Sequence, residues 1–136
     1  VRLVGSEMCI RDSLRAAVAA PTRTVRSMGL DAEPAKPLPD GVLRQIAREN
    51  ELTMVYQMQQ DGHEWADRLL FCAKEATYKC WFPLTRRWLG FDEAEIEIRT
   101  DGTFTSQLLA RPTPAPYFEG RWVVRGGYVI ASAFLE

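Results

Sequence analysis

The stretch FCAKEATYK, residues 71–79, places charged side chains in a segment that is otherwise largely apolar. The charges belong to Lys74, Glu75 and Lys79. A carboxylate or ammonium is costly to bury alone, so it loses its charge, pairs with an opposite charge, or holds a metal ion or an anion. We therefore expect these three side chains to find partners elsewhere in the chain.

Two carboxylates upstream are the expected partners for a metal ion. Residues 27–33 follow an apolar, β-branched lead-in and stop before Pro34, which predicts the end of a strand. Side chains two apart on a strand share a face, so Asp31 and Glu33 project together. Gly29, on the same face, would leave room for a bulky ligand. The other face would point into a core and carries Met28, Leu30 and Ala32.

Together these groups have the chemistry of a site for Mg²⁺ and a phosphorylated ligand. Mg²⁺ takes hard oxygen ligands, keeps some of its water, and is commonly completed by substrate phosphate. We expect Asp31, Glu33 and Glu75 to share the ion, with Lys74 and Lys79 close by. The three carboxylates should then converge in the fold although they are far apart in the sequence.

The positions of apolar residues predict the elements that hold this site. A long helix over about residues 64–82 would stop at Pro83. One of its stripes would face the core and consists of Trp65, Leu69, Cys72, Ala76 and Cys80. A second stripe flanks Glu75 and consists of Phe71, Tyr78 and Phe82.

The remaining elements follow from alternation and turn signals. We expect strands at residues 14–20 and 25–33, an extended linker at 34–39, and short helices at 41–48 and near 52–59. Two hairpins should follow, each with a glycine-containing turn. Their strands are residues 94–98 with 103–109, and residues 120–125 with 128–135.

Two motifs resemble the paired motifs of the 4′-phosphopantetheinyl transferases. Gly29-Leu30-Asp31-Ala32-Glu33 is similar to the family's G-x-D-x-E, and residues 71–79 are similar to its F-C-x-K-E-A-x-x-K form. Order and spacing both match. The flanks at residues 37–43 and 80–85 are similar to the bacterial branch that includes the enterobactin-synthase type and its mycobacterial-type relatives. The similarity runs from about Leu14 to the end of the chain.

The resemblance implies Mg²⁺-dependent transfer of the phosphopantetheine arm of coenzyme A to a serine of an apo acyl or peptidyl carrier protein. By motif position, Asp31, Glu33 and Glu75 would hold Mg²⁺, and Lys79 would sit on the phosphates. Lys74 would hold a phosphate or the developing negative charge. Glu75, or a water bound to the metal, would be the base, so the implied catalytic residues are Glu75 and Lys79. The carrier could serve fatty acid, polyketide or siderophore synthesis.

The resemblance also implies an α+β fold built as a pseudo-dimer of two similar halves, of which this chain holds mainly the C-terminal one. Residues 14–33 would be the last strands of the N-terminal subdomain, and residues 34–136 the C-terminal α+β subdomain. Residues 1–13, VRLVGSEMCIRDS, lack an initiating methionine and a clear period. They resemble a translated sequencing-adapter leader, and we leave them out of the expected fold.

Because the chain would lack most of the first half, we expect effects on its affinity for coenzyme A and on its exposed apolar surface. The absent portion would carry basic and histidine residues that grip the nucleotide, so coenzyme A should bind weakly. Apolar surface should be exposed around Met28, Phe71 and Tyr78. The full-length enzyme would be monomeric.

Composition excludes several classes of protein. The chain has 136 residues, 46% of them hydrophobic, and a net charge of −1, so it can build one core and has no global attraction to nucleic acid or membrane. It contains no apolar run of eighteen residues, as a membrane span would need. We expect a cytoplasmic protein in which Cys72 and Cys80 are buried free thiols.

Simpler interpretations and other functions remain open. Glu75 and Lys79 could be an ordinary helical ion pair, and Asp31 and Glu33 the wet face of a strand. A divalent-metal nuclease also uses Asp, Glu and Lys, but with the Glu and Lys two apart on a strand. A further alternative is a catalytically inactive fragment that only binds coenzyme A or carrier protein. The segment at residues 86–88, Arg-Arg-Trp, could meet an acidic carrier or form a solvated turn.

Overall fold

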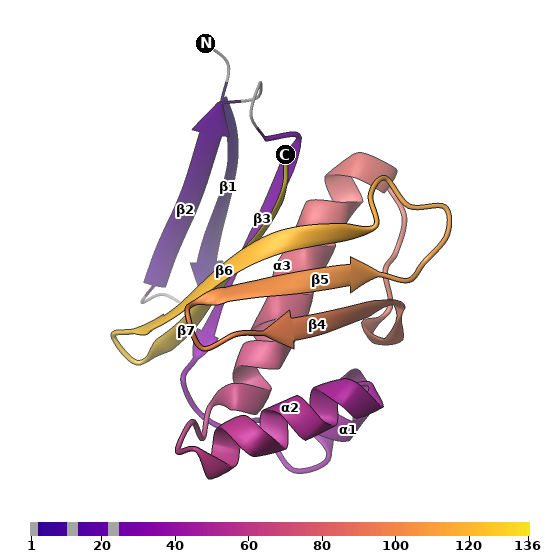
Figure 1. The fold of residues 1–136 in the computed structure, drawn as a ribbon. Helices are drawn as coiled ribbons and strands as arrows, with labels where there is room; N and C mark the ends of the chain where they lie inside the picture. Colours follow the sequence, from indigo (N-terminus) through magenta and orange to yellow (C-terminus); the bar gives the residue numbers. More distant parts are fainter. Residues whose placement is uncertain (1–2, 11–13, 22–24) are drawn as a thin grey trace.

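The computed structural model describes the backbone of residues 3–10, 14–21 and 25–136, and the side chains of residues 25–136. Its main sheet is antiparallel and has the strand order β3-β7-β6-β5-β4 (Figure 1). The strands are β3 (Ser27–Pro34), β4 (Ala94–Ile98), β5 (Thr103–Leu108), β6 (Tyr117–Arg125) and β7 (Tyr128–Leu135). The helices are α1 (Val42–Ile46), α2 (Glu49–Gln60), α3 (Ala66–Thr85) and the short 3-10 helix η1 (Phe91–Glu93). The predicted α+β class is confirmed.

Helix α3 lies across one face of the sheet and packs mainly on β3 and β7 (Figure 1). The predicted core stripe is confirmed at Leu69, Cys72, Ala76 and Cys80, which are fully buried. Small residues on β7, Ala131 and Ala133, face the same core and are also fully buried. Cys72 and Cys80 are free thiols, as predicted.

Gly29 sets how closely α3 approaches the sheet. A Cβ atom at this position would lie 2.2 Å from the carbonyl oxygen of Ala76 and 2.5 Å from the amide nitrogen of Cys80. The expectation that Gly29 leaves room for a bulky ligand is therefore wrong, because the backbone of α3 fills that room. The missing side chain brings the helix into contact with the strand that carries Asp31 and Glu33.

We predict that Gly29→Ala destabilises the protein by about 1–3 kcal/mol or more. The added methyl group would meet backbone atoms of α3, and these cannot move aside as a flexible side chain can. Chemical denaturation of the parent and variant would measure the loss. An unchanged free energy of unfolding would show that α3 does not pack on β3 in this way.

The hairpins match the sequence predictions closely. Strands β4 and β7 have the predicted bounds, and β5 ends one residue early. The turns use Gly102 at φ +90°, and Gly126 and Gly127 at φ +59° and +80°, conformations that glycine adopts without a steric penalty. Strand β6 begins at Tyr117, earlier than predicted, because residues 117–119 still pair with β5.

Helix α3 was predicted to stop at Pro83, but it continues to Thr85. Proline removes one helical hydrogen bond, yet side chains supply others around it. The Ser27 hydroxyl donates to the carbonyl of Cys80 at 2.7 Å, and the Thr85 hydroxyl donates to that of Trp81 at 3.1 Å. The helix ends at Arg86, which has a φ of +56°.

Helix α2 runs along the outer strand of the sheet, β4. Its side chains accept hydrogen bonds from the β4 backbone. The amide of Ile96 donates to Glu51 Oε2 at 2.7 Å, and the amide of Ile98 donates to Met54 Sδ at 3.1 Å. The helix therefore occupies the hydrogen-bonding positions that a further strand would use.

The first two strands form a separate antiparallel pair, β1 (Leu3–Ile10) with β2 (Leu14–Pro21), that contacts β3 (Figure 1). Strand β2 agrees with the prediction. Strand β1 falls in residues 1–13, which the sequence analysis left out of the expected fold; that these residues are a non-native leader stays a prediction. Strand β3 pairs with β7 along its whole length. The division of residues 14–33 and 34–136 into subdomains stays a prediction.

The expected exposed apolar surface is only partly present. Met28 is buried, and Phe71 and Tyr78 are partly buried. Phe82 and Trp88, beside Tyr78, are the exposed members of this region. None of the helices within the described residues is long and apolar enough to cross a bilayer.

Candidate functional site

The contact between β3 and α3 joins two residues that are far apart in the sequence. Lys79 Nζ on α3 donates a hydrogen bond to Asp31 Oδ1 on β3 at 3.0 Å. The aspartate residue is only 4% exposed. Its second oxygen, Oδ2, is buried without a hydrogen-bond partner in the part of the chain whose side chains are described. Buried carboxylate oxygens seldom lack a partner, so this atom indicates a place for a cation or donor.

Glu33 and Glu75 complete a cluster of acidic groups around Lys79. Burial raises the pKa of Glu33 to about 7, and the charge of Asp31 adds to the rise. Burial also raises the pKa of Asp31, against the opposing effect of Lys79. The pKa of Glu75 is raised by burial, opposed by Lys79 and reinforced by Glu33. The fold thus brings the predicted carboxylates into one electrostatic neighbourhood, with Arg68 at its edge, 3.9 Å from Glu33.

The cluster has the donor chemistry for Mg²⁺ but does not show a formed coordination shell. Among residues 25–136, no three His, Cys, Asp or Glu side chains are arranged to hold a metal ion. The positive charge beside Asp31 is the ammonium of Lys79. Carboxylate oxygens and the unsatisfied Oδ2 fit a hard cation. The residue types therefore fit Mg²⁺ by their donor chemistry.

The raised pKa values predict that stability falls as the pH rises. Folded Glu33 keeps its proton up to about pH 7, whereas the ordinary glutamate value is 4.5. Between these values the folded state binds more protons than the unfolded state, so the free energy of unfolding decreases with increasing pH. Melting temperatures from about pH 5 to about pH 8 without divalent metal would measure this, and Glu33→Gln should flatten the profile. A melting temperature that rises across this window would contradict the assignment.

Lys74 does not join the cluster. Its Nζ lies 2.8 Å from Glu51 Oε1, and the two side chains are 2% and 0% exposed. It also donates to the carbonyl of Ala94 at 3.0 Å and to that of Phe91. Burial lowers the pKa of Lys74, and Glu51 opposes that effect. The structure therefore gives no support to the prediction that Lys74 holds a phosphate.

Sequence analysis did not identify Glu51 as part of this region. A local signal was present, since Glu51 lies three residues after Arg48 and accepts its backbone amide at 2.8 Å, as a capping residue does. Capping signals predict helix starts, not a buried partner on another helix. The pairing of Glu51 with Lys74 could be recognised only from the three-dimensional structure.

A small cavity of about 80 Å³ opens beside Glu75. Its walls come from α3 and from the segment that leads into β4, and they include Lys74, Glu75, Tyr78, Trp88, Leu89 and Phe91. The rings of Tyr78 and Trp88 are 5.0 Å apart, and Trp88 is 71% exposed. The cavity is thus a narrow, mostly apolar recess with a carboxylate in its lining.

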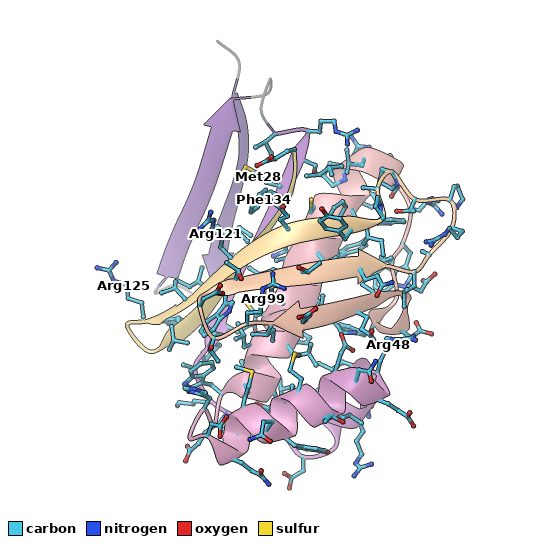
Figure 2. The ribbon with its side chains drawn as sticks, in the orientation of Figure 1. Met28, Arg48, Arg99, Arg121, Arg125 and Phe134 are labelled. Atoms are coloured by element: carbon cyan, nitrogen blue, oxygen red, sulfur yellow. The ribbon has the colours of Figure 1, made fainter. Side chains whose placement is uncertain are left out.

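Larger hollows lie on the face of the sheet turned away from α3. One of about 570 Å³ lies over β4 and β5, and another has about 450 Å³. Arg99 and Arg121, which are labelled in Figure 2, line the second hollow. Neither is lined by any of the four residues Asp31, Glu33, Glu75 and Lys79. Size alone therefore does not locate the candidate site.

The Arg-Arg-Trp segment after α3 divides into a structural part and an exposed part. Arg87 stacks over the ring of Trp81 at 5.0 Å and donates to the carbonyl of Pro112. Arg86 lies over the ring of Phe82 at 5.6 Å. Trp88 and Phe82 remain exposed near the cavity. Only Arg86 and these two rings are suited to meet another molecule.

The structure is an antiparallel α+β domain in which helix α3 carries the Lys-Glu motif against the G-x-D-x-E motif of strand β3. The model of the 4′-phosphopantetheinyl transferase superfamily matches residues 27–133. The chain belongs to this superfamily. It is similar to three curated proteins, each named a 4′-phosphopantetheinyl transferase.

These relatives are actinobacterial and longer than this chain. Npt of Nocardia iowensis is 42% identical over 135 residues, which cover 89% of this chain and 60% of Npt. PptT of Mycobacterium tuberculosis is 44% identical over 131 residues, covering 89% and 57%. Svp of Streptomyces mobaraensis is 42% identical over 142 residues, covering 96% and 55%. The chain therefore spans little more than half the length of the curated relatives it matches.

Proposed function

We propose that this protein transfers the 4′-phosphopantetheine arm of coenzyme A to a serine of an apo acyl or peptidyl carrier protein. The observation that carries the proposal is the grouping of Asp31, Glu33 and Glu75 around Lys79 where β3 meets α3. Membership of the superfamily supports the same reaction. Carrier proteins of fatty acid, polyketide or siderophore synthesis are the proposed partners, and the cytoplasm is the proposed location.

The acidic residues would hold Mg²⁺, with Asp31 and Glu33 contributed by β3 and Glu75 by α3. The ion would neutralise charge on the pyrophosphate of coenzyme A as the serine oxygen bonds to phosphorus and adenosine 3′,5′-bisphosphate leaves. Lys79, around which the carboxylates are grouped, would donate to a phosphate oxygen. Glu75 has a raised pKa, which suits a group that accepts the serine proton.

The recess beside Glu75 would take only a short part of the transferred arm, since its volume is about 80 Å³. Phosphopantetheine is slender and largely uncharged beyond its phosphate, and the recess is narrow with aromatic walls from Tyr78, Trp88 and Phe91. Exposed Trp88 and Phe82 with Arg86 would then face the incoming carrier protein. This arrangement would place the phosphate end of the arm near Lys79 and Glu75.

Two other functions are compared with this one. Binding of coenzyme A or carrier protein without transfer is the first alternative. A divalent-metal nuclease receives less support, because Lys74 and Glu75 lie on helix α3 and the Lys74 ammonium is buried against Glu51.

The experiment is a transfer assay with the chain as it is. Incubation with coenzyme A, Mg²⁺ and an apo carrier protein should give a carrier whose mass has increased by one phosphopantetheine. The gain should disappear with a metal chelator or with a carrier whose acceptor serine is replaced by alanine. Coenzyme A binding without any mass gain would support the non-catalytic alternative instead.

A further inference from the structure

A buried ion pair fastens α3 to α2 and β4 on a side of the helix away from Lys79. Lys74 Nζ and Glu51 Oε1 are 2.8 Å apart. Glu51 also accepts the amide of Arg48 at 2.8 Å and, through Oε2, the amide of Ile96 at 2.7 Å. One carboxylate therefore links the start of α2, the middle of β4 and the middle of α3.

The ammonium of Lys74 is fully used. An ammonium group has three hydrogens to donate. Lys74 Nζ contacts Glu51 Oε1 and the carbonyl oxygens of Ala94 and Phe91. Binding a phosphate would require breaking one of these contacts, and leaving Glu51 would strand a carboxylate in a buried site. The structure thus opposes a direct role for Lys74 in phosphate binding.

Lys74 connects the two walls of the recess beside Glu75. Lys74 immediately precedes Glu75 on α3, and its other two contacts are to residues 91 and 94. Phe91 and Ala94 form the opposite wall of the recess. A shift of the Lys74 ammonium would therefore release the carbonyls of residues 91 and 94, which hold the other wall of the recess against α3.

We propose that Glu51 and Lys74 are positioning residues for Glu75, and that they set the width of the recess beside it. The proposal rests on the transferase function proposed above. In this proposal Lys74 does not bind phosphate but holds α3 against Glu51 and the segment before β4. Glu51 then affects the reaction without contacting the substrate.

The test compares four variants with the parent in steady-state kinetics. Glu51→Gln and Lys74→Met should each lower kcat about tenfold or more and leave KM for coenzyme A within about twofold. The double variant should be no worse than the poorer single variant, because both act through one contact. The control is Glu95→Gln, which removes a carboxylate from the more exposed Arg48–Glu95 pair of the same α2–β4 contact, and it should behave as the parent.

A phosphate-binding Lys74 would give a different pattern. Lys74→Met would then raise KM for coenzyme A about tenfold or more while Glu51→Gln left KM and kcat unchanged, and this result would overturn the proposal. Should a single variant fail to fold because one charge is left buried alone, the double variant removes both charges. A folded double variant with parental kcat would also overturn it.

A second readout does not depend on transfer. Amide resonances of Glu75 and Phe91 in nuclear magnetic resonance spectra should shift in Glu51→Gln, or in the double variant, and stay in place in Glu95→Gln. Unmoved resonances in the Glu51 variants would overturn the positioning role. If the parent shows no transfer, the proposed function fails, while these spectra still decide whether the pair positions Glu75.

Discussion

Lys79→Met should lower the rate of phosphopantetheine transfer by about 100- to 1000-fold, the usual loss for one donor at a developing charge. The ammonium lies 3.0 Å from Asp31 and would turn to a phosphate oxygen when coenzyme A binds. Affinity for coenzyme A should fall as well. Transfer kinetics and calorimetric titration with coenzyme A would measure the two effects.

The matched control for Lys79 is Lys36→Met, which removes an exposed ammonium from the linker before α1. It should transfer phosphopantetheine at the parental rate. If Lys79→Met and Lys36→Met were equally active, Lys79 would have a structural role, as in its ion pair with buried Asp31. The effect of Lys79→Met would then be confined to stability.

Asp31→Asn should abolish Mg²⁺-dependent binding of coenzyme A without unfolding the protein. The side chain keeps its shape and loses the charge that a hard cation needs. Burial raises the pKa of Asp31 even with Lys79 beside it, so the site disfavours the charge and the neutral amide should be tolerated.

Melting temperatures with and without Mg²⁺ and coenzyme A would test the Asp31 prediction. The parent should be stabilised by the two ligands together, and the variant should not. Asp40→Asn, at an exposed position before α1, serves as the control and should respond as the parent. An Asp31→Asn protein that is still stabilised by Mg²⁺ and coenzyme A together would remove Asp31 from the metal site.

The sequence was sufficient for much of the scaffold because local patterns determine it. Alternation and paired glycines located β7 and its turn, and helical spacing located the buried stripe of α3. The end of α3 was misjudged because the helix continues past Pro83 to Thr85, where the hydroxyls of Ser27 and Thr85 bond to the carbonyls of Cys80 and Trp81. These contacts depend on how β3 and α3 pack, and no local pattern contains that information.

Only part of the candidate site was predicted correctly, and the reason is geometric. Glu75 and Lys79 are four apart and share a side of the helix, whereas Lys74 and Lys79 are five apart and so differ by about 140° around the axis. Lys74 and Lys79 therefore point in different directions and are poorly placed to bind the same phosphate. The identity of each lysine's partner, Glu51 or Asp31, comes from tertiary packing. Gly29 was misread for the same reason, since the close approach of α3 cannot be seen in the sequence.

The way α2 closes the outer strand has a consequence for self-association. Glu51 and Met54 occupy the outward amides of Ile96 and Ile98, so a neighbouring molecule cannot add a strand there by main-chain pairing. Loss of α2 from this position would uncover a template for aggregation in a strand rich in isoleucine. The glutamate that is proposed to position the catalytic carboxylate therefore also helps to keep separate copies of the chain from joining their sheets.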